Sequence, residues 1–433
     1  MRIERSRQLH ERARAVMPGG NTRSSVFESP FPLYAASGSG AWLTDVDGNR
    51  FLDFTNNFTT LIHGHAFEPV NAAILRQLPF GASFGSPTEL EIELAELLCE
   101  RVSWFDHVRF TNTGSEAVMM AIRAARAFTG RPKIVKCEGA YHGNYDPVEV
   151  SFDPTPENWG SNRPSPVPYN SGTPASVLEQ TVVVPFNDIA ATKELLHEHA
   201  AEIACVLVDP MPARAGLVPA ERAYLAFLRE FTRANGMVLI SDEVLNFRLS
   251  HGGAIGRFGI AADLCAFGKI IGGGLPIGAV AGKTEFMAVF DPSRGKPPVP
   301  QAGTFTANPL SMTAGIAAMR AMTPETFDRL NALGEAARQG LREAIRGAGV
   351  PGQVTGLGSL FQIKLNDRTL RSYRDQYPDA AERARLAKLV RMVRDKGVLI
   401  SSTGLGALST PMVQADIDRL VAIIGDACKE ARA

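Results

Sequence analysis

Short, continuously apolar runs alternate with helical patterns through the middle of the chain, and this alternation restricts the fold more than any other feature. Helical patterns cover Ser115–Phe128 and Ala220–Asn235, for example. The runs do not alternate polar with apolar residues, which is typical of strands that are covered on both faces. Strands that alternate with helices predict an α/β fold around a mostly parallel sheet. The expected strands are Lys133–Lys136, Thr181–Val184, Cys205–Val208, Met237–Ile240, Leu264–Phe267 and Ile277–Ala281.

The segments before this region predict a helix and a hairpin. Residues 1–35 read as a helix followed by a Pro/Gly/Ser loop, and Trp42–Phe54 reads as a β-hairpin that turns at Asp47-Gly48. A further helix is expected over Thr88–Ser103, where Thr88 and Glu91 have the spacing of a capping box.

The pattern of helical and strand segments changes after Pro309 and predicts a smaller α+β domain. A long helical region covers about 311–347, and the last helix starts near Gln414. We expect residues 1–50 to be an N-terminal part of the small domain, 51–310 to be a large domain, and 311–433 to be the C-terminal small domain. Between the two helical regions lie strand candidates and one more helix, at Ser359–Leu365, Ala380–Lys396, Val398–Ser401 and Gly406–Ser409.

Charge and cysteine content exclude several classes of protein. The chain has 45 basic and 45 acidic side chains, so it lacks the basic face that a nucleic-acid binder needs. No apolar stretch reaches the length of a membrane span, and the arginine-rich start is not a secretory signal. Five widely spaced cysteines, an odd number without a C-x-x-C motif, argue against disulfides and zinc and favour a cytoplasmic protein without a metal site.

A carboxylate and a lysine follow two neighbouring predicted strands. Asp242 follows the run Met237–Ser241, and Lys269 follows the next run, 27 residues later. This separation is about one strand–helix–strand step, so both side chains are expected in the crevice where open α/β sheets bind ligands. A lysine there can form a Schiff base with an aldehyde, and an aspartate can pair with a protonated pyridine nitrogen. The alternative is that each residue only caps its strand or turn.

Small and hydroxyl residues suggest a phosphate site at the start of a helix. Thr113, Gly114 and Ser115 lead directly into the helical pattern, where backbone amides can bind an anion. The alternative is an ordinary N-cap by Ser115 or Thr113. Thr304 offers another hydroxyl, and Tyr141-His142-Gly143 supplies an aromatic ring suited to stacking on a flat ligand.

Together these motifs resemble the class III, fold-type I pyridoxal-phosphate aminotransferases, and in particular glutamate-1-semialdehyde aminomutase and the β-amino-acid (β-phenylalanine type) aminotransferases. The resemblance covers nearly the whole chain. It implies a large domain with a mostly parallel, seven-stranded type of sheet, a small α+β domain, and a homodimer with active sites at its interface. The matching motifs are Asp45–Asn49, Gly64-His65, Phe110–Ala117, Thr129–Arg131, Tyr141–Gly143, Asp242–Val244, Gly268–Gly274 and Gly303–Phe305.

The resemblance also implies a role for each motif. Lys269 would hold pyridoxal 5'-phosphate as an internal aldimine and act as the catalytic base, and Asp242 would keep the pyridine nitrogen protonated. Thr113, Gly114 and Ser115 would bind the phosphate, together with Thr304 of the partner subunit. The remaining expected contacts of the cofactor are Tyr141 and His142, Val244 on the opposite ring face, and Asp209, which stands where the family usually has glutamate; Asn187 is a weaker candidate.

The branch within the family determines the expected substrates, which are a small-molecule amino acid and a keto acid. The spacing between Asp242 and Lys269 and the segment around Arg23 are more similar to the β-amino-acid branch, and Arg23 falls on that branch's carboxylate-binding arginine. The alternative for Arg23 is a surface residue in a polar loop. We therefore expect transamination of a β-amino acid, with intramolecular transfer in glutamate-1-semialdehyde as the second hypothesis.

The acceptor and the side-chain pocket stay open at this stage. Gly404 lies near the place of a second arginine in the β-phenylalanine-type enzymes, which argues against 2-oxoglutarate unless Arg163 or Arg214 replaces that arginine. Four phenylalanines are candidates either for an apolar pocket or, for at least two of them, for the core: Phe27, Phe31, Phe58 and Phe84.

Overall fold

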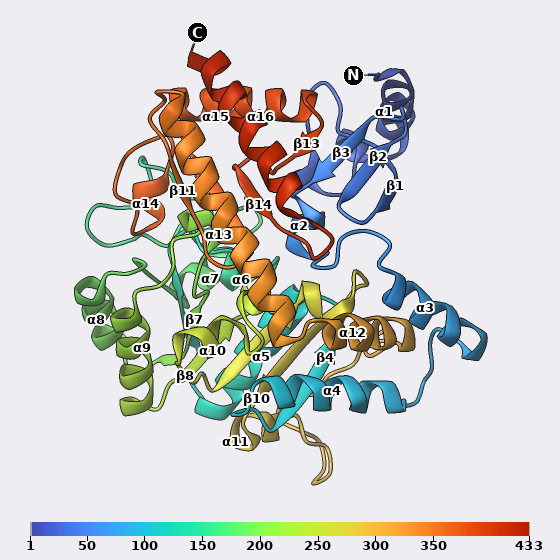
Figure 1. The fold of residues 1–433 in the computed structure, drawn as a ribbon. Coiled ribbons are helices and arrows are strands. Elements are labelled where there is room, and N and C mark those ends of the chain that lie inside the picture. Colours follow the sequence, from blue (N-terminus) through green and yellow to red (C-terminus); the bar gives the residue numbers. More distant parts are fainter. Residues whose placement is uncertain (1, 433) are drawn as a thin grey trace.

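The computed structural model describes residues 2–432 and is built around a seven-stranded sheet (Figure 1). The strand order is β4-β10-β9-β8-β7-β5-β6. The five strands β9, β8, β7, β5 and β6 are parallel to one another, whereas β10 is antiparallel to both β9 and β4. This confirms the predicted α/β fold with a mostly parallel sheet. The strands are β4 (His107–Thr111), β5 (Lys133–Cys137), β6 (Thr181–Val184), β7 (Ile203–Val208), β8 (Val238–Asp242), β9 (Leu264–Gly268) and β10 (Gly278–Gly282).

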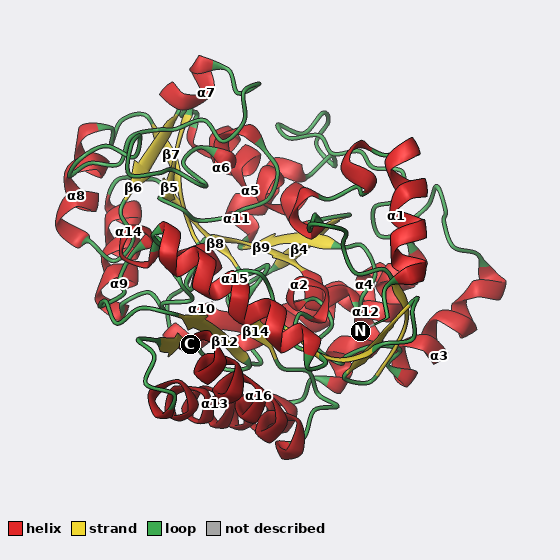
Figure 2. Cartoon of the chain, turned by 90° about the horizontal axis from the view of Figure 1, so that it is seen from above, coloured by secondary structure: helices red, strands yellow, loops and turns green. Residues whose placement is uncertain are grey.

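Alternate residues of the central strands belong to two separate cores, one on each face of the sheet. On β7, Cys205 and Leu207 pack into the core under α5 (Gly114–Thr129), whereas Val206 and Val208 pack into the larger core on the other face. Helix α9 (Arg222–Ala234) contributes Tyr224 to that larger core. Helices therefore cover both faces of the sheet, as Figure 2 shows from above, which explains why its central strands are mostly apolar.

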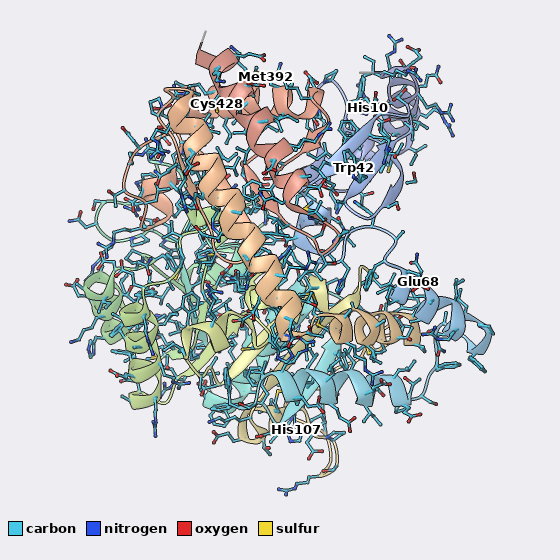
Figure 3. All side chains as sticks on the ribbon, viewed as in Figure 1. His10, Trp42, Glu68, His107, Met392 and Cys428 are labelled. Atoms are coloured by element: carbon cyan, nitrogen blue, oxygen red, sulfur yellow. The ribbon has the colours of Figure 1, made fainter. Side chains whose placement is uncertain are left out.

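Both ends of the chain build the second part of the molecule. A four-stranded sheet joins β1, β2 and β3 to β13, and β13 pairs in parallel with β3. A three-stranded sheet has the order β11-β12-β14. His10 and Trp42 thus lie at the same end of the molecule as Met392 and Cys428 (Figure 3). The strands are β1 (Ala35–Ser39), β2 (Trp42–Asp45), β3 (Arg50–Asp53), β11 (Gln353–Thr355), β12 (Leu360–Lys364), β13 (Val398–Leu399) and β14 (Leu405–Ala407).

The remaining helices surround these sheets. Helix α12 contacts α3 and α4, and α13 contacts α16. No helix within residues 2–432 has the length and apolarity that a membrane crossing requires. The helices not yet given are α1 (Glu4–Val16), α2 (Asn56–Thr59), α3 (Glu68–Gln77), α4 (Glu89–Arg101), α6 (Asp146–Glu149), α7 (Ala175–Glu179), α8 (Ile189–Glu198), α10 (Gly253–Phe258), α11 (Thr284–Met287), α12 (Pro309–Ala321), α13 (Pro324–Gly347), α14 (Tyr373–Gln376), α15 (Ala380–Asp395) and α16 (Gln414–Arg432).

Three local expectations were wrong or incomplete. The long helix expected over about 311–347 is two helices, because Thr323 caps a new helix that has Pro324 at its first position. Helix α4 forms as expected, but the Thr88 hydroxyl is buried and makes no capping hydrogen bond. Strand β4 was not expected, because its sequence mixes polar with apolar residues. The division into residues 1–50, 51–310 and 311–433 stays a prediction.

Candidate active site

The carboxyl ends of three strands meet at one edge of the large sheet. Asp242 is the last residue of β8, and Gly268 is the last residue of β9. Gly278 pairs with both Gly268 and Thr111, so the end of β4 lies at the same edge. The strand order therefore brings Asp242, Lys269 and the turn into α5 to one place, where open α/β sheets bind their ligands.

Asp242 is buried and its two carboxylate oxygens have different partners. Oδ2 lies 2.7 Å from Nδ1 of His142, and Oδ1 accepts a hydrogen bond from the backbone N–H of Val244 at 3.0 Å. Burial lowers the pKa of His142, although the hydrogen bond and charge of Asp242 act in the opposite direction. A neutral His142 donates Nδ1–H to the carboxylate, which fixes the carboxylate's orientation. Nε2 of His142 is buried and has no partner in residues 2–432.

Lys269 lies directly beyond β9 in a conformation that lysine rarely adopts, with φ of +50°. Desolvation lowers the pKa of its amine, the nearby charges of Asp242 and Asp209 oppose this shift, and the charge of Arg248 adds to it. A lower pKa increases the fraction of neutral amine, which is the form that attacks a carbonyl carbon.

The turn between β4 and α5 is a narrow cradle with hydroxyl groups. Oγ1 of Thr113 caps α5 by accepting from Glu116 N at 3.1 Å, and Oγ of Ser115 accepts from Asn144 N at 3.1 Å. The Ser115 hydroxyl hydrogen is still available to an anion at this helix N-terminus. A Cβ on Gly114 would lie 2.9 Å from both methyl carbons of Val244, so only glycine fits there without displacing a neighbour.

Tyr141 lies on the loop that approaches this turn. Its hydroxyl donates to Oδ1 of Asn144 at 3.0 Å, and its ring lies 5.2 Å from the ring of Phe152. About half of Tyr141 is exposed, so part of the residue is accessible to a ligand. Thr304 is also exposed, in the segment that precedes α12, and contacts none of these groups by a hydrogen bond within the described chain.

Asp209 is paired with a residue that the sequence reasoning missed. Its Oδ1 accepts from Met211 N at 2.8 Å and from Nδ2 of Asn246 at 2.5 Å. Burial raises the pKa of Asp209 well above its usual value, and the charge of Asp242 raises it further. Oδ1 of Asn246 is buried without a partner among the described residues. The only signal for Asn246 in the sequence is its place four residues after Asp242.

Arg23 lies in the exposed loop before β1 and contacts a short turn. Its Nη1 lies 3.5 Å from Oδ1 of Asn57, and its guanidinium carbon lies 5.5 Å from the centre of the Phe58 ring. Beside it is a cavity of about 550 Å³ that includes Met17, Thr22 and Phe27 in its lining.

The expectation that at least two of the four phenylalanines belong to the core was wrong. Phe27, Phe58 and Phe84 are exposed, and Phe31 is half-buried beside His10. They lie on loops and a short turn outside the strands and long helices.

The two replacement arginines and Asn187 are engaged elsewhere. Arg163 pairs with Glu194 and Glu198 of α8, whereas Arg214 pairs with Asp153 and lies 4.8 Å from the ring of Phe152, next to Tyr141. Asn187 bonds backbone groups of Pro219, Glu221 and Arg371.

Position 404 has no room for a side chain. Gly404 has φ of +78°, and a Cβ there would lie 2.6 Å from Ile363 O. The absence of an arginine at this position therefore agrees with the local backbone.

These features define a class of protein: a lysine, an aspartate and a phosphate cradle at the carboxyl edge of a fold-type I sheet suit an aldehyde cofactor with a pyridine ring and a phosphate. The aminotransferase class-III family model matches residues 24–427. The chain belongs to this family, whose enzymes use pyridoxal phosphate, which confirms the predicted family, fold class and cofactor.

Individual relatives come from both expected branches. The chain is 38% identical to the glutamate-1-semialdehyde 2,1-aminomutase of Methanosphaera stadtmanae over 97% of each chain. It superposes on an omega-transaminase from Sphaerobacter thermophilus with a TM-score of 0.97, 50% identity and complete coverage of both chains. A β-phenylalanine aminotransferase from Variovorax paradoxus gives a TM-score of 0.87 and 37% identity over 97% of this chain and 92% of that one.

Proposed function

We propose that the protein transfers the amino group of a carboxylate-bearing amine, a β-amino acid, to a keto acid. The observation that carries the proposal is Arg23: its guanidinium is exposed, and within residues 2–432 it has no carboxylate partner. A guanidinium fork binds a carboxylate through two parallel hydrogen bonds, which fixes the substrate's pose.

The residues around Lys269 and Asp242 fit pyridoxal phosphate. When bound, the cofactor supplies an electron sink that stabilises negative charge on the substrate carbon. Asp242, oriented by His142 and Val244 N, would keep the pyridine nitrogen of the cofactor protonated. Ser115 and the amides at the start of α5 would bind the phosphate, and Gly114 leaves space for this group.

Lys269 performs two tasks in this proposal. Its amine, of which the lowered pKa leaves a larger fraction neutral, would hold the cofactor through its aldehyde carbon. When the substrate is bound, Nζ of Lys269 would be the base that accepts the proton from the substrate carbon that carries the amine. Tyr141 would stack on one face of the cofactor ring and Val244 would pack against the other.

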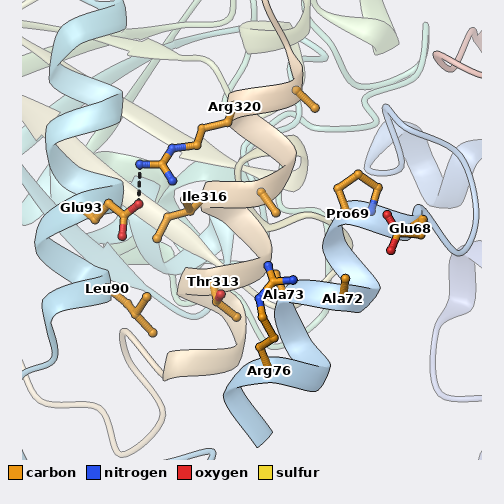
Figure 4. Close-up of a pocket in the computed structure, with 12 residues that line it drawn as sticks. Glu68, Pro69, Ala72, Ala73, Arg76, Leu90, Glu93, Thr313, Ile316 and Arg320 are labelled. Carbon is orange, nitrogen blue, oxygen red and sulfur yellow. Dashed lines mark ion pairs between the residues drawn. The ribbon is translucent and has the colours of Figure 1, made fainter.

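The homodimer is part of the same proposal. The side chains of Leu75, Leu78, Phe80 and Ile92 on and beside α3 and α4 are exposed, Phe80 by 76%. Between α3, α4 and α12 lies an open cavity of about 620 Å³, crossed by the Glu93–Arg320 ion pair at 2.6 Å (Figure 4). Such a patch is typical of a subunit interface, and Thr304, which is exposed, would reach the partner's phosphate across it. The five free cysteines support the expected cytoplasmic location.

The test is a transamination assay with matched amino donors and acceptors. The protein, loaded with cofactor, is mixed with β-phenylalanine and either pyruvate or 2-oxoglutarate, and the amino acid formed is measured. Turnover that requires both substrates supports the proposal. The similarity to aminomutases keeps intramolecular transfer as a second candidate: conversion of glutamate-1-semialdehyde to 5-aminolevulinate without any added acceptor, with no turnover of β-phenylalanine, would replace the proposal by that one.

A further inference from the structure

A turn of left-handed backbone lies directly beneath Arg23. Asn56, Asn57, Phe58 and Thr59 have φ of +46°, +47°, +52° and +72°. None of the four is glycine, so each adopts a conformation that its Cβ disfavours. Runs of such residues persist only where their surroundings over-determine the backbone, and they occur preferentially at functional sites.

The two ends of this turn are fixed by buried polar contacts. Asn56 is fully buried; its backbone N–H donates to Oδ1 of Asp53 at 3.1 Å and its Nδ2 donates to Ala407 O at 2.6 Å. At the other end, Nη1 of Arg248 donates to Thr59 O at 3.1 Å. These contacts hold the turn against β3 and β14 in spite of its strain.

Arg248 connects the turn to the surroundings of Lys269. Its side chain is fully buried, and its Nε donates to Oγ of Ser359 at 2.9 Å. The charge of Arg248 also lowers the pKa of Lys269, so the two side chains lie within electrostatic reach of each other. Arg248 therefore contacts the turn and also lies near Lys269, the proposed catalytic lysine.

The two residues in the middle of the turn are exposed and contact Arg23. Oδ1 of Asn57 is the one hydrogen-bond acceptor of the guanidinium in the described chain, at 3.5 Å, and the Phe58 ring lies under the guanidinium at 5.5 Å. A guanidinium held by a ring face and one acceptor keeps its remaining donors for a ligand.

We propose that the left-handed turn Asn56–Thr59 positions Arg23 relative to Lys269, and that Asn57 and Phe58 thereby set which separation of amine and carboxylate the enzyme accepts. The proposal rests on the proposed function, because it concerns the carboxylate that Arg23 binds. Asn57 and Phe58 act through Arg23 as positioning residues, and they take no part in the proton transfers at Lys269.

The variant Asn57→Gly tests this inference, because glycine adopts φ of +47° more easily than asparagine but has no acceptor. We expect an unchanged or slightly raised thermal midpoint, an unchanged kcat, and a KM for β-phenylalanine raised about 3- to 10-fold, the ratio expected for loss of one hydrogen bond. The KM for 1-phenylethylamine, which has no carboxylate, stays within twofold. The dissociation constant of 3-phenylpropanoate, measured by titration calorimetry, rises by the same factor as the KM for β-phenylalanine.

Ala66→Gly is the matched control. Ala66 is exposed and has φ of +50°, so this variant relieves the same backbone strain away from Arg23. Its kinetic constants should equal those of the wild type.

A double-mutant cycle with Arg23→Lys separates positioning from a general structural role. If Asn57 acts through Arg23, then Asn57→Gly has no further effect on KM in the Arg23→Lys background. Equal effects in both backgrounds, or equal rises in KM for the two amines, would overturn the inference. If Arg23→Lys itself leaves the KM of β-phenylalanine unchanged, the carboxylate assignment in the proposed function fails; if only Asn57→Gly is without effect, the proposed function stands and this inference fails.

Discussion

Replacing Arg248 by methionine removes a fully buried charge that holds three distant segments together. Its guanidinium donates to Ser359 Oγ, to Thr59 O and to the carbonyl oxygen of Leu408, and it forms no ion pair with a carboxylate among residues 2–432. Methionine has a similar length but donates nothing. Three buried acceptors therefore lose their partner at once.

The expected loss of stability follows from these contacts. A buried acceptor left without a partner costs about 1–3 kcal/mol, so three cost about 3–9 kcal/mol. The desolvated guanidinium is itself unfavourable, as its pKa of about 9 reflects, and exchanging buried charge for an apolar side chain returns about 1–4 kcal/mol. Taking the middle of each range, a cost of about 6 kcal/mol less a return of about 2.5 kcal/mol, the free energy of unfolding should fall by about 3–4 kcal/mol.

Urea unfolding of the cofactor-loaded protein, followed by far-ultraviolet circular dichroism, measures this difference. Arg371→Met is the matched control, because Arg371 is exposed and pairs with Glu221 on the surface. Surface pairs contribute about 0–1 kcal/mol, so this control should unfold close to the wild type. An Arg248→Met variant within about 1 kcal/mol of the wild type would refute the reasoning, as would an equal loss in Arg371→Met.

Three further predictions concern pH, the cofactor and the subunit interface. Burial lowers the pKa of Lys136 to about 7 from 10.5. Between these values the unfolded state binds more protons than the folded state, so the free energy of unfolding rises with pH, and from pH 7 to 9 the wild type should gain up to about 1.4 kcal/mol per pH unit relative to Lys136→Met. A difference in urea unfolding that does not change with pH would contradict this. Ser115→Ala should weaken cofactor binding about 10-fold, measured by equilibrium dialysis against pyridoxal phosphate, and a change below about twofold would argue against a phosphate contact. Leu78→Glu with Phe80→Glu should give monomers of lower cofactor content by light scattering and absorbance; a stable, fully loaded dimer would place the interface elsewhere.

The parts of the fold that the sequence predicted are those with strong local signals. The apolar runs marked the parallel strands because both faces of the sheet are buried, and the chain order of Asp242 and Lys269 placed them at neighbouring strand ends. Strand β4 was not predicted because it lies at the sheet edge beside β10, where part of its surface stays exposed and its sequence is not an apolar run. The break between α12 and α13 depends on the hydroxyl of Thr323, which caps α13. The helical patterns on both sides gave no sign of this break.

The parts of the site that escaped prediction depend on contacts between distant segments. Asn246 belongs to the site because its side chain donates a hydrogen bond to Asp209, which lies 37 residues earlier in the chain. The left-handed turn contains no glycine to mark it, and its conformation is imposed by Arg248, Asp53 and Ala407. Periodicity and local motifs cannot reveal such partners, because the folded chain alone brings them together.

The central claim is that Lys269 holds the cofactor in an enzyme that transaminates β-amino acids. The most direct measurement is a single half-reaction: the loaded protein is mixed with β-phenylalanine without any acceptor, and the visible absorbance of the lysine-bound cofactor and the keto acid formed are followed together. The account predicts loss of that absorbance with one keto acid released per subunit, its recovery on adding a keto acid, and neither change in Lys269→Ala. Unchanged absorbance with β-phenylalanine, or turnover that persists in Lys269→Ala, would contradict it.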